Sequence, residues 1–221
     1  MIYSDERIRR VLRLLVWLIP IILLLTFTAA IIFYPEPYYP FFEYISMLSG
    51  FYSENGYVNI TSSIIMIIGL CFCSIISSVI SVLYFIKKSI RYRFTKATYF
   101  TLLAIGLIGS SFPVDYNSVF ALLNKGGWFL FLLGFSFSNF IILFLRLARR
   151  YGTRTFEKSP IFFIDLSFVI LMFLLILWFL ISYFIDYFLA TINTYLMRTF
   201  TEKIILICNF IFVFLLSIDD M

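Results

Sequence analysis

A few charged and amide side chains interrupt the apolar runs of this chain, and their types could support chemistry. An ionised group in lipid costs about 2.5–3.5 kcal/mol unless it is paired, so such groups mark ion paths, proton relays or ligand sites. They occur at two junctions between apolar runs and in one aromatic connection. We expect them to meet in one outward-facing polar cluster made of Glu43, Asp115, Asn124, Lys125, Arg198, Glu202 and Lys203.

The same residues also have a structural interpretation, in which the cluster is a network that caps a helix bundle. Both interpretations stay open at this point. A second set is Asp165 with Arg146 and Arg149. The two arginines follow the end of one apolar run and Asp165 lies near the start of the next, so this set is expected on the side of the bundle opposite to the polar cluster. We interpret it as an ion pair that joins two helices, and the alternative is a proton-binding site at Asp165.

The sequence contains no constellation typical of an enzyme. Histidine, the usual general base near neutral pH, is absent, and no phosphate-binding Gly-rich loop, HExxH or GxSxG pattern occurs. The three cysteines, Cys71, Cys73 and Cys208, lie inside apolar runs and form no recognisable metal motif. We predict no catalytic residue, metal or cofactor, with carboxylate-only chemistry as the alternative.

Six long apolar runs must position these residues. Hydrophobic residues make up 62% of the 221 residues and charged residues 13%, against about a quarter charged in soluble domains. A bilayer core about 30 Å thick needs about 20 helical residues, and the runs cover 14–34, 58–86, 97–113, 119–145, 161–187 and 200–218. Because the runs do not alternate with period two, they predict an all-α polytopic membrane protein, one domain with a bundle of about six transmembrane helices.

The basic residues give the bundle a direction. Fourteen of the seventeen precede the first run, separate the second from the third, or separate the fourth from the fifth. The positive-inside rule assigns those segments and both chain ends to the cytoplasm. The net charge of +5 follows from this rule rather than from nucleic-acid binding. We predict a multi-pass protein of the cell membrane that binds membrane lipids, with other membrane protein subunits as further candidate partners and no nucleic acid.

Small residues predict where helices approach closely. They recur at spacing four in the second run and appear in pairs in the third and fourth, at Gly69, Cys73, Ser77, Ser81, Gly106, Gly109, Gly127 and Gly134. The aromatic connection 35–57 is expected to lie at the outer membrane surface, with a short helix near 41–49. We expect it to pack with the apolar stretch 189–199 as a cap.

Several short elements carry a family resemblance. They are Tyr34-Pro35, Ile45-Ser46-Met47-Leu48-Ser49, Asn59 at the opening of the second run, the stretch from Gly109 through Phe112-Pro113 to Asp115, and Glu202-Lys203. Together they resemble the DUF998 family of six-span membrane proteins, whose function is unknown. The resemblance implies a six-helix membrane fold and no settled activity. Family members usually have a histidine at the start of the fourth helix, where this chain has Asn124 or Lys125, so histidine-dependent chemistry is not implied.

Two function hypotheses follow. The first is a non-enzymatic scaffold or accessory subunit that binds lipid or another membrane protein, because the chain is rich in apolar and aromatic residues suited to interfaces. The second is a transporter or intramembrane enzyme that acts on a lipid or small solute through the outer cluster. A cavity lined by at least three of Glu43, Asp115, Lys125 and Glu202 would favour the second.

Overall fold

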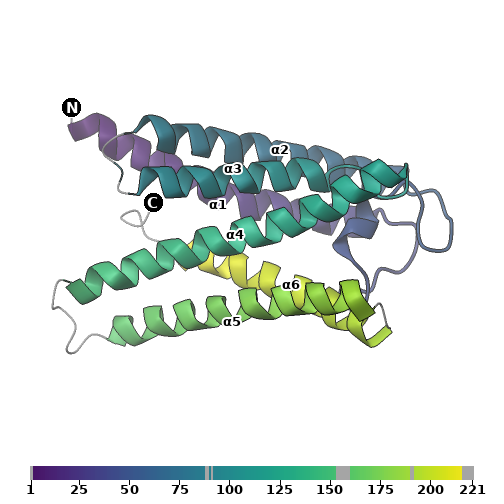
Figure 1. Ribbon diagram of the computed structural model, residues 1–221. Helices are drawn as coiled ribbons and strands as arrows, with labels where there is room; N and C mark the ends of the chain where they lie inside the picture. Colours follow the sequence, from purple (N-terminus) through teal and green to yellow (C-terminus); the bar gives the residue numbers. More distant parts are fainter. Residues whose placement is uncertain (1, 88–89, 91, 153–159, 190–191, 216–221) are drawn as a thin grey trace.

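The computed structural model describes residues 2–87, 90, 92–152, 160–189 and 192–215 (Figure 1). Its elements are α1 (Ile2–Ile32), the 3₁₀-helix η1 (Ile45–Ser49), α2 (Ile60–Ile86), α3 (Arg93–Ser110), α4 (Ser118–Gly152), α5 (Pro160–Leu189) and α6 (Ile192–Leu215). Within these ranges there is no strand, only an isolated antiparallel bridge between Tyr52 and Val58. The predicted all-α fold with six helices is confirmed.

The helix ends differ from the predicted runs where charged residues continue a helix. The α1 helix begins at Ile2 and includes the basic segment before position 14, and α4 extends to Gly152. The α6 helix begins at Ile192, so the expectation that 192–199 belongs to a connection is wrong. Arg, Lys and Glu are good helix formers. Hydropathy therefore marks where lipid can surround a helix but not where the helix ends.

Four helices are long and apolar enough to cross a membrane. These stretches are Glu6–Ile32 in α1, Ile60–Ile86 in α2, Ser118–Ala148 in α4 and Phe163–Ile185 in α5. The other two fall short in composition, because α3 carries Arg93 and Lys96 within only 18 residues and the first half of α6 carries Arg198, Glu202 and Lys203. Length and composition thus indicate a helical membrane protein with at least these four candidate spans.

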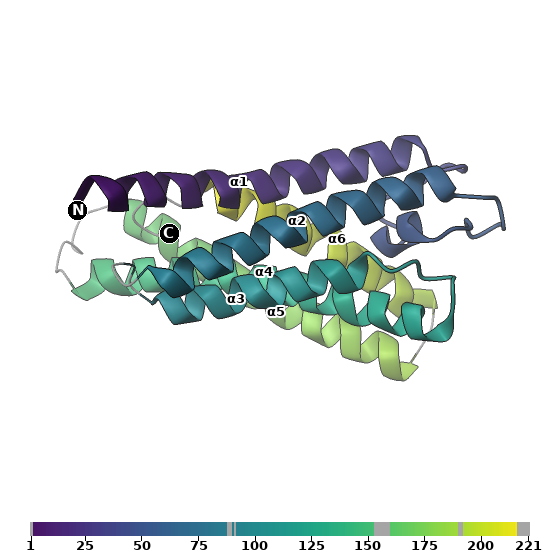
Figure 2. The ribbon, with the colours of Figure 1, turned by 90° about the horizontal axis from the view of Figure 1, so that it is seen from above.

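The helices run roughly along one common direction, and α4 joins two groups of them (Figures 1 and 2). The α2 helix packs against α1 and α3, while α4 packs against α3, α5 and α6. At one end of the bundle α1 begins, α2 ends, α3 begins, α4 ends, α5 begins and α6 ends (Figure 1). The opposite end holds η1 and the connection from α3 to α4, and we call it the η1 end.

Small residues lie where the helices approach most closely, as predicted. On α2, Ser74 and Ser81 donate hydrogen bonds of 2.8 and 2.9 Å to backbone carbonyls of α3. Between α3 and α4, a Cβ placed on Gly109 would lie 2.7 Å from the Cα of Gly127. The two backbones are therefore in direct contact, which supplies the van der Waals attraction that lipid otherwise competes for.

The connection between α1 and α2 folds back against the bundle. Ser63 in α2 donates a 2.8 Å hydrogen bond to the carbonyl of Ser49, and the buried Asn59 donates one of 2.8 Å to the carbonyl of Gly50. These bonds hold η1 against the start of α2. The short helix predicted near 41–49 is present in its second half only, as η1, and its position places loop residues over the ends of the helices.

Candidate functional site

A cavity of about 330 Å³ lies at the η1 end among η1, α4, α5 and α6. Aromatic side chains form much of its wall, namely Tyr44, Trp128, Phe129, Phe179 and Tyr183. Its charged lining residues are Lys125 from α4 and Arg198 and Glu202 from α6. A mostly apolar wall with a few converging polar groups is typical of a ligand site, and this volume is at the lower end of the usual range.

Arg198 is held at the cavity by two aromatic rings. Its guanidinium carbon lies 4.3 Å from the ring centroid of Tyr183 and 5.0 Å from that of Tyr44. Attraction between a cation and the face of a ring is worth about 0.5–2 kcal/mol, and more where water is excluded. Because Tyr44 precedes η1 and Tyr183 belongs to α5, the arginine also links three separate segments around the cavity.

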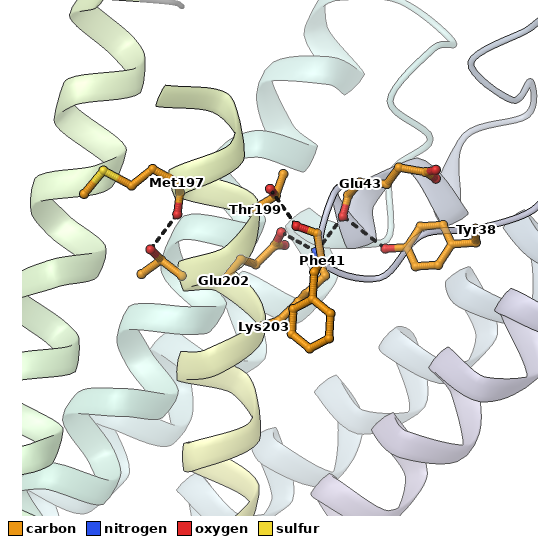
Figure 3. A network of polar contacts seen from close by, with 8 residues as sticks. Tyr38, Phe41, Glu43, Met197, Thr199, Glu202 and Lys203 are labelled. Carbon is orange, nitrogen blue, oxygen red and sulfur yellow. Dashed lines mark hydrogen bonds and ion pairs between the residues drawn. The ribbon is translucent and has the colours of Figure 1, made fainter. Parts of the chain in front are cut away.

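Glu202 and Lys203 form a buried ion pair beside the cavity (Figure 3). Lys203 Nζ lies 3.2 Å from Glu202 Oε2 and donates a 2.6 Å hydrogen bond to the backbone carbonyl of Glu43. Thr199 donates a further bond of 3.2 Å to the carbonyl of Phe41. The predicted packing of the aromatic connection against the segment before position 200 is therefore confirmed, and its polar contacts use backbone carbonyls of the connection.

The Glu43 side chain faces away from this ion pair. Its carboxylate lies on the far side of its backbone from Lys203 (Figure 3), and Oε1 accepts a 3.3 Å hydrogen bond from the backbone N–H of Tyr39. Burial raises the pKa of the Glu43 carboxyl, the Tyr39 N–H opposes that rise, and the nearby charges of Glu54 and Glu36 add to it. Glu43 thus contributes a backbone carbonyl to the cluster rather than a charge.

Glu43→Gln is expected to raise the melting temperature slightly at pH 7. The folded protein binds the Glu43 proton more tightly than the unfolded chain, so this residue's contribution to stability falls as pH rises from about 4.5 through the raised pKa. Glutamine keeps an acceptor for Tyr39 but carries no charge. The gain should vanish below about pH 4, when both states of the wild type are protonated. Thermal melts across pH measure it.

The matched control is Glu6→Gln, because Glu6 lies at the other end of the bundle and is exposed, 3.9 Å from Arg10. An advantage of Glu43→Gln that stays constant between about pH 4 and about pH 8 would contradict the assignment, since linkage requires the difference to follow the titration of the carboxyl.

Asp115 and Asn124 form a separate polar group. Asp115 is exposed and accepts hydrogen bonds of 2.9 and 2.6 Å from the backbone N–H groups of Phe51 and Tyr52. Asn124 is fully buried, and its side-chain amide lies within hydrogen-bond distance of the carbonyls of Ser110 and Phe112 and of the Ser49 hydroxyl. The seven predicted residues therefore divide: Lys125, Arg198 and Glu202 share the cavity, Lys203 and the Glu43 carbonyl lie beside it, and Asp115 and Asn124 bind the connections together.

The ion pair predicted between α4 and α5 is present at the opposite end of the bundle. Arg146 Nη2 lies 2.6 Å from Asp165 Oδ1, and the two side chains are 11% and 2% exposed. The side chain of Arg149, the second predicted partner, lies outside the described residues. The structural interpretation of Asp165 is supported by this geometry.

Asn139 and Asn209 form a buried contact between α4 and α6 that the sequence reasoning missed. Asn139 Nδ2 donates to Asn209 Oδ1 at 2.8 Å, and Asn209 Nδ2 donates to the Ser136 hydroxyl at 2.8 Å. An isolated amide in an apolar run is a usable signal, because such a group faces the bundle interior to find a partner. Tyr44, Trp128 and Tyr183 carry no comparable signal, since aromatic residues are frequent throughout this chain.

Among the described residues, no group of three or more His, Cys, Asp or Glu side chains lies close enough to hold a metal ion. The chain matches no family model, and neither the curated proteins nor the solved structures contain a match.

Proposed function

We propose that this chain crosses the cell membrane six times, with both ends in the cytoplasm. The arrangement of the helix ends supports it, because α1 begins and α6 ends at the same end of the bundle (Figure 1). The basic segments before position 14, around 87–96 and around 146–158 adjoin helix ends at that same end, as the positive-inside rule requires of a cytoplasmic face. The η1 end is then the outer end, and a six-span member of the family that the chain resembles would have this topology.

We further propose that the protein works by binding, as an accessory or scaffold subunit that holds a lipid at its outer end. The cavity at the η1 end is the observation that carries this proposal, because its wall is mainly aromatic and apolar and its charges stand on two helices. The remaining polar groups of the predicted cluster have structural partners. Asp115 binds two backbone N–H groups, and Lys203 binds Glu202 and a backbone carbonyl.

A transporter or intramembrane enzyme is the alternative function. Lys125 and Glu202 both line the cavity, which favours it in part. However, Asp115 anchors the connection before α2 and Glu43 turns its carboxylate away from the Glu202–Lys203 pair (Figure 3). Fewer than three of the four residues named for this hypothesis therefore line the cavity, and binding is the function we favour.

The test is native mass spectrometry of the protein extracted from membranes in mild detergent. We expect a retained lipid at fixed stoichiometry, which Ser46→Phe should remove because Ser46 lines the cavity and a ring there would fill it. Ser167→Phe is the control, since Ser167 is an exposed α5 residue near the opposite end. A ligand-free monomer, or equal retention by both variants, would contradict the proposal, and a retained protein in place of lipid would replace it.

A further inference from the structure

Glu202 brings a carboxylate oxygen without a partner to the cavity at the η1 end. The residue is 5% exposed and lines the cavity from α6. Lys203 Nζ lies 3.2 Å from Oε2 (Figure 3), whereas Oε1 has no hydrogen-bond partner within the part of the chain that the structure describes. Oε1 is not among the enclosed polar atoms that lack a partner, so a molecule in the cavity can reach it.

The neighbouring lysine is already engaged. Lys203 Nζ donates a 2.6 Å hydrogen bond to the carbonyl of Glu43 in addition to its contact with Oε2, and this bond holds the aromatic connection on α6. A carboxylate has room for about four hydrogen bonds, and a charged oxygen in poorly hydrated surroundings is unfavourable unless donors surround it. A donor group on a bound molecule would therefore be stabilised at Oε1.

Lys125 supplies the opposite kind of group on a second helix. It lines the cavity from α4 and is exposed, and no hydrogen bond or ion pair involves it within the described ranges of the chain. A lysine ammonium binds phosphate as a point charge. The cavity thus offers an acceptor on α6 for a hydrogen-bond donor and a cation on α4 for an anionic oxygen.

The rest of the wall suits a hydrocarbon chain. Phe129 of α4 stands against Phe179 and Tyr183 of α5, with ring centroids 6.1 and 4.6 Å apart. Trp128 and Leu132 are 5% and 2% exposed and line the same cavity. An apolar wall beside an acceptor and a cation matches an amphiphile whose headgroup carries both a donor and a phosphate.

We propose that the cavity selects a phospholipid with a primary ammonium headgroup, whose N–H donates to Glu202 Oε1, whose phosphate lies at Lys125 and whose chain lies against Phe129 and Phe179. This inference rests on the proposed lipid-binding function and adds the headgroup. A headgroup with a quaternary ammonium has the same charge but no N–H, so it cannot donate to Oε1 and would bind less tightly.

Trp128 provides a reporter in the cavity wall. The chain has three tryptophans, so Trp17→Phe with Trp178→Phe leaves Trp128 alone. The protein is placed in nanodiscs of unlabelled phosphatidylcholine with increasing fractions of one lipid that has brominated acyl chains, because bromine quenches tryptophan on close approach. The brominated lipids are phosphatidylethanolamine, its N-methyl and N,N-dimethyl derivatives, and phosphatidylcholine. Their net charge is the same, and each methylation removes one N–H donor.

We expect half-maximal quenching of Trp128 at a fraction of phosphatidylethanolamine about tenfold lower than of phosphatidylcholine, the factor for about one charge-assisted hydrogen bond. The last methylation should cause the largest step, because the dimethyl headgroup still has an N–H for Oε1. Glu202→Gln should remove most of the preference, since an amide oxygen carries no charge. The lipid series itself leaves Glu202 unchanged, so it decides the assignment even where Glu202→Gln does not fold.

Two controls accompany the series. Lys125→Gln should leave the preference unchanged, because all four lipids carry the same phosphate. Trp178 lies on the exposed surface of α5, about 16 Å along the helix from Leu189, while Trp128 lies about 15 Å along α4 from Ser118. With Trp178 as the sole tryptophan, the four brominated lipids should quench equally.

The outcomes separate this inference from the function on which it rests. Equal quenching of Trp128 by the four lipids, with lipid still retained in mass spectrometry, would overturn the headgroup assignment alone. A preference for phosphatidylcholine would show that the aromatic wall binds a quaternary ammonium, and brominated phosphatidylglycerol as effective as phosphatidylethanolamine would show that a hydroxyl donor suffices; either result would also overturn the assignment. Absence of quenching at Trp128 while Trp178 is quenched would overturn lipid binding at the cavity as well.

Discussion

Gly127→Ala is expected to disrupt the packing of α3 on α4 and to lower the free energy of unfolding by about 3 kcal/mol, the upper part of the range for overpacking. A Cβ at this position would overlap the backbone nitrogen of Ser110 and the backbone of Gly109. Those atoms belong to the main chain of α3, which cannot rotate aside as a flexible side chain would. The two helices must separate, and contacts along their interface are lost.

The neighbouring glycine is a control within the same turn of α4. A Cβ on Gly126 would have no contact within 4 Å, and alanine favours a helix over glycine by about 1 kcal/mol. Gly126→Ala should therefore melt at or slightly above the wild-type temperature in mild detergent, while Gly127→Ala melts well below it. Equal melting temperatures for the two variants would contradict the direct backbone contact between α3 and α4.

Asp165→Leu is the second substitution with a large expected effect, a loss of about 3–5 kcal/mol. It removes the carboxylate that lies 2.6 Å from Arg146 and leaves the guanidinium charge in a site where its side chain is only 11% exposed. Water cannot readily replace the lost partner there. Unfolding in a graded denaturing detergent measures the loss, and leucine keeps the number and branching of the side-chain heavy atoms of aspartate, although its methyl groups are larger than the oxygens they replace.

The double variant Asp165→Leu with Arg146→Leu tests whether the charge causes that loss. Replacing both members of a buried pair by apolar side chains is often neutral or stabilising, so the double variant should recover most of the stability. A double variant as unstable as Asp165→Leu alone would show that the two charges are not coupled, and would reopen the alternative that Asp165 binds a proton for its own reason.

The fold was largely predictable, because a helix surrounded by lipid must be apolar along most of its length. Continuous apolar runs and the position of basic residues between them were enough to predict six helices and the shared end of α1 and α6. The start of α6 at Ile192 was missed, because Asn193, Thr194 and Arg198 lower the hydropathy of a segment that is nonetheless helical. Hydropathy reports the surroundings of a helix, and Arg198 lies where α6 meets Tyr44 of the aromatic connection.

The candidate site was predictable in its residue types but not in its grouping. Charges in apolar surroundings identified Lys125, Arg198 and Glu202, all of which line the cavity. The fold of the connection before α2 decides that Asp115 binds loop N–H groups instead. The contact of Arg198 with Tyr44 spans most of the chain, and no local pattern in a single sequence specifies such a pairing.

The most direct test of lipid binding at the outer end is a structure of the protein in lipid nanodiscs. We expect elongated density of a lipid in the cavity, with its apolar part against Phe129 and Phe179. A cavity that holds only water under these conditions, or one closed by movement of η1 onto α4, would contradict it.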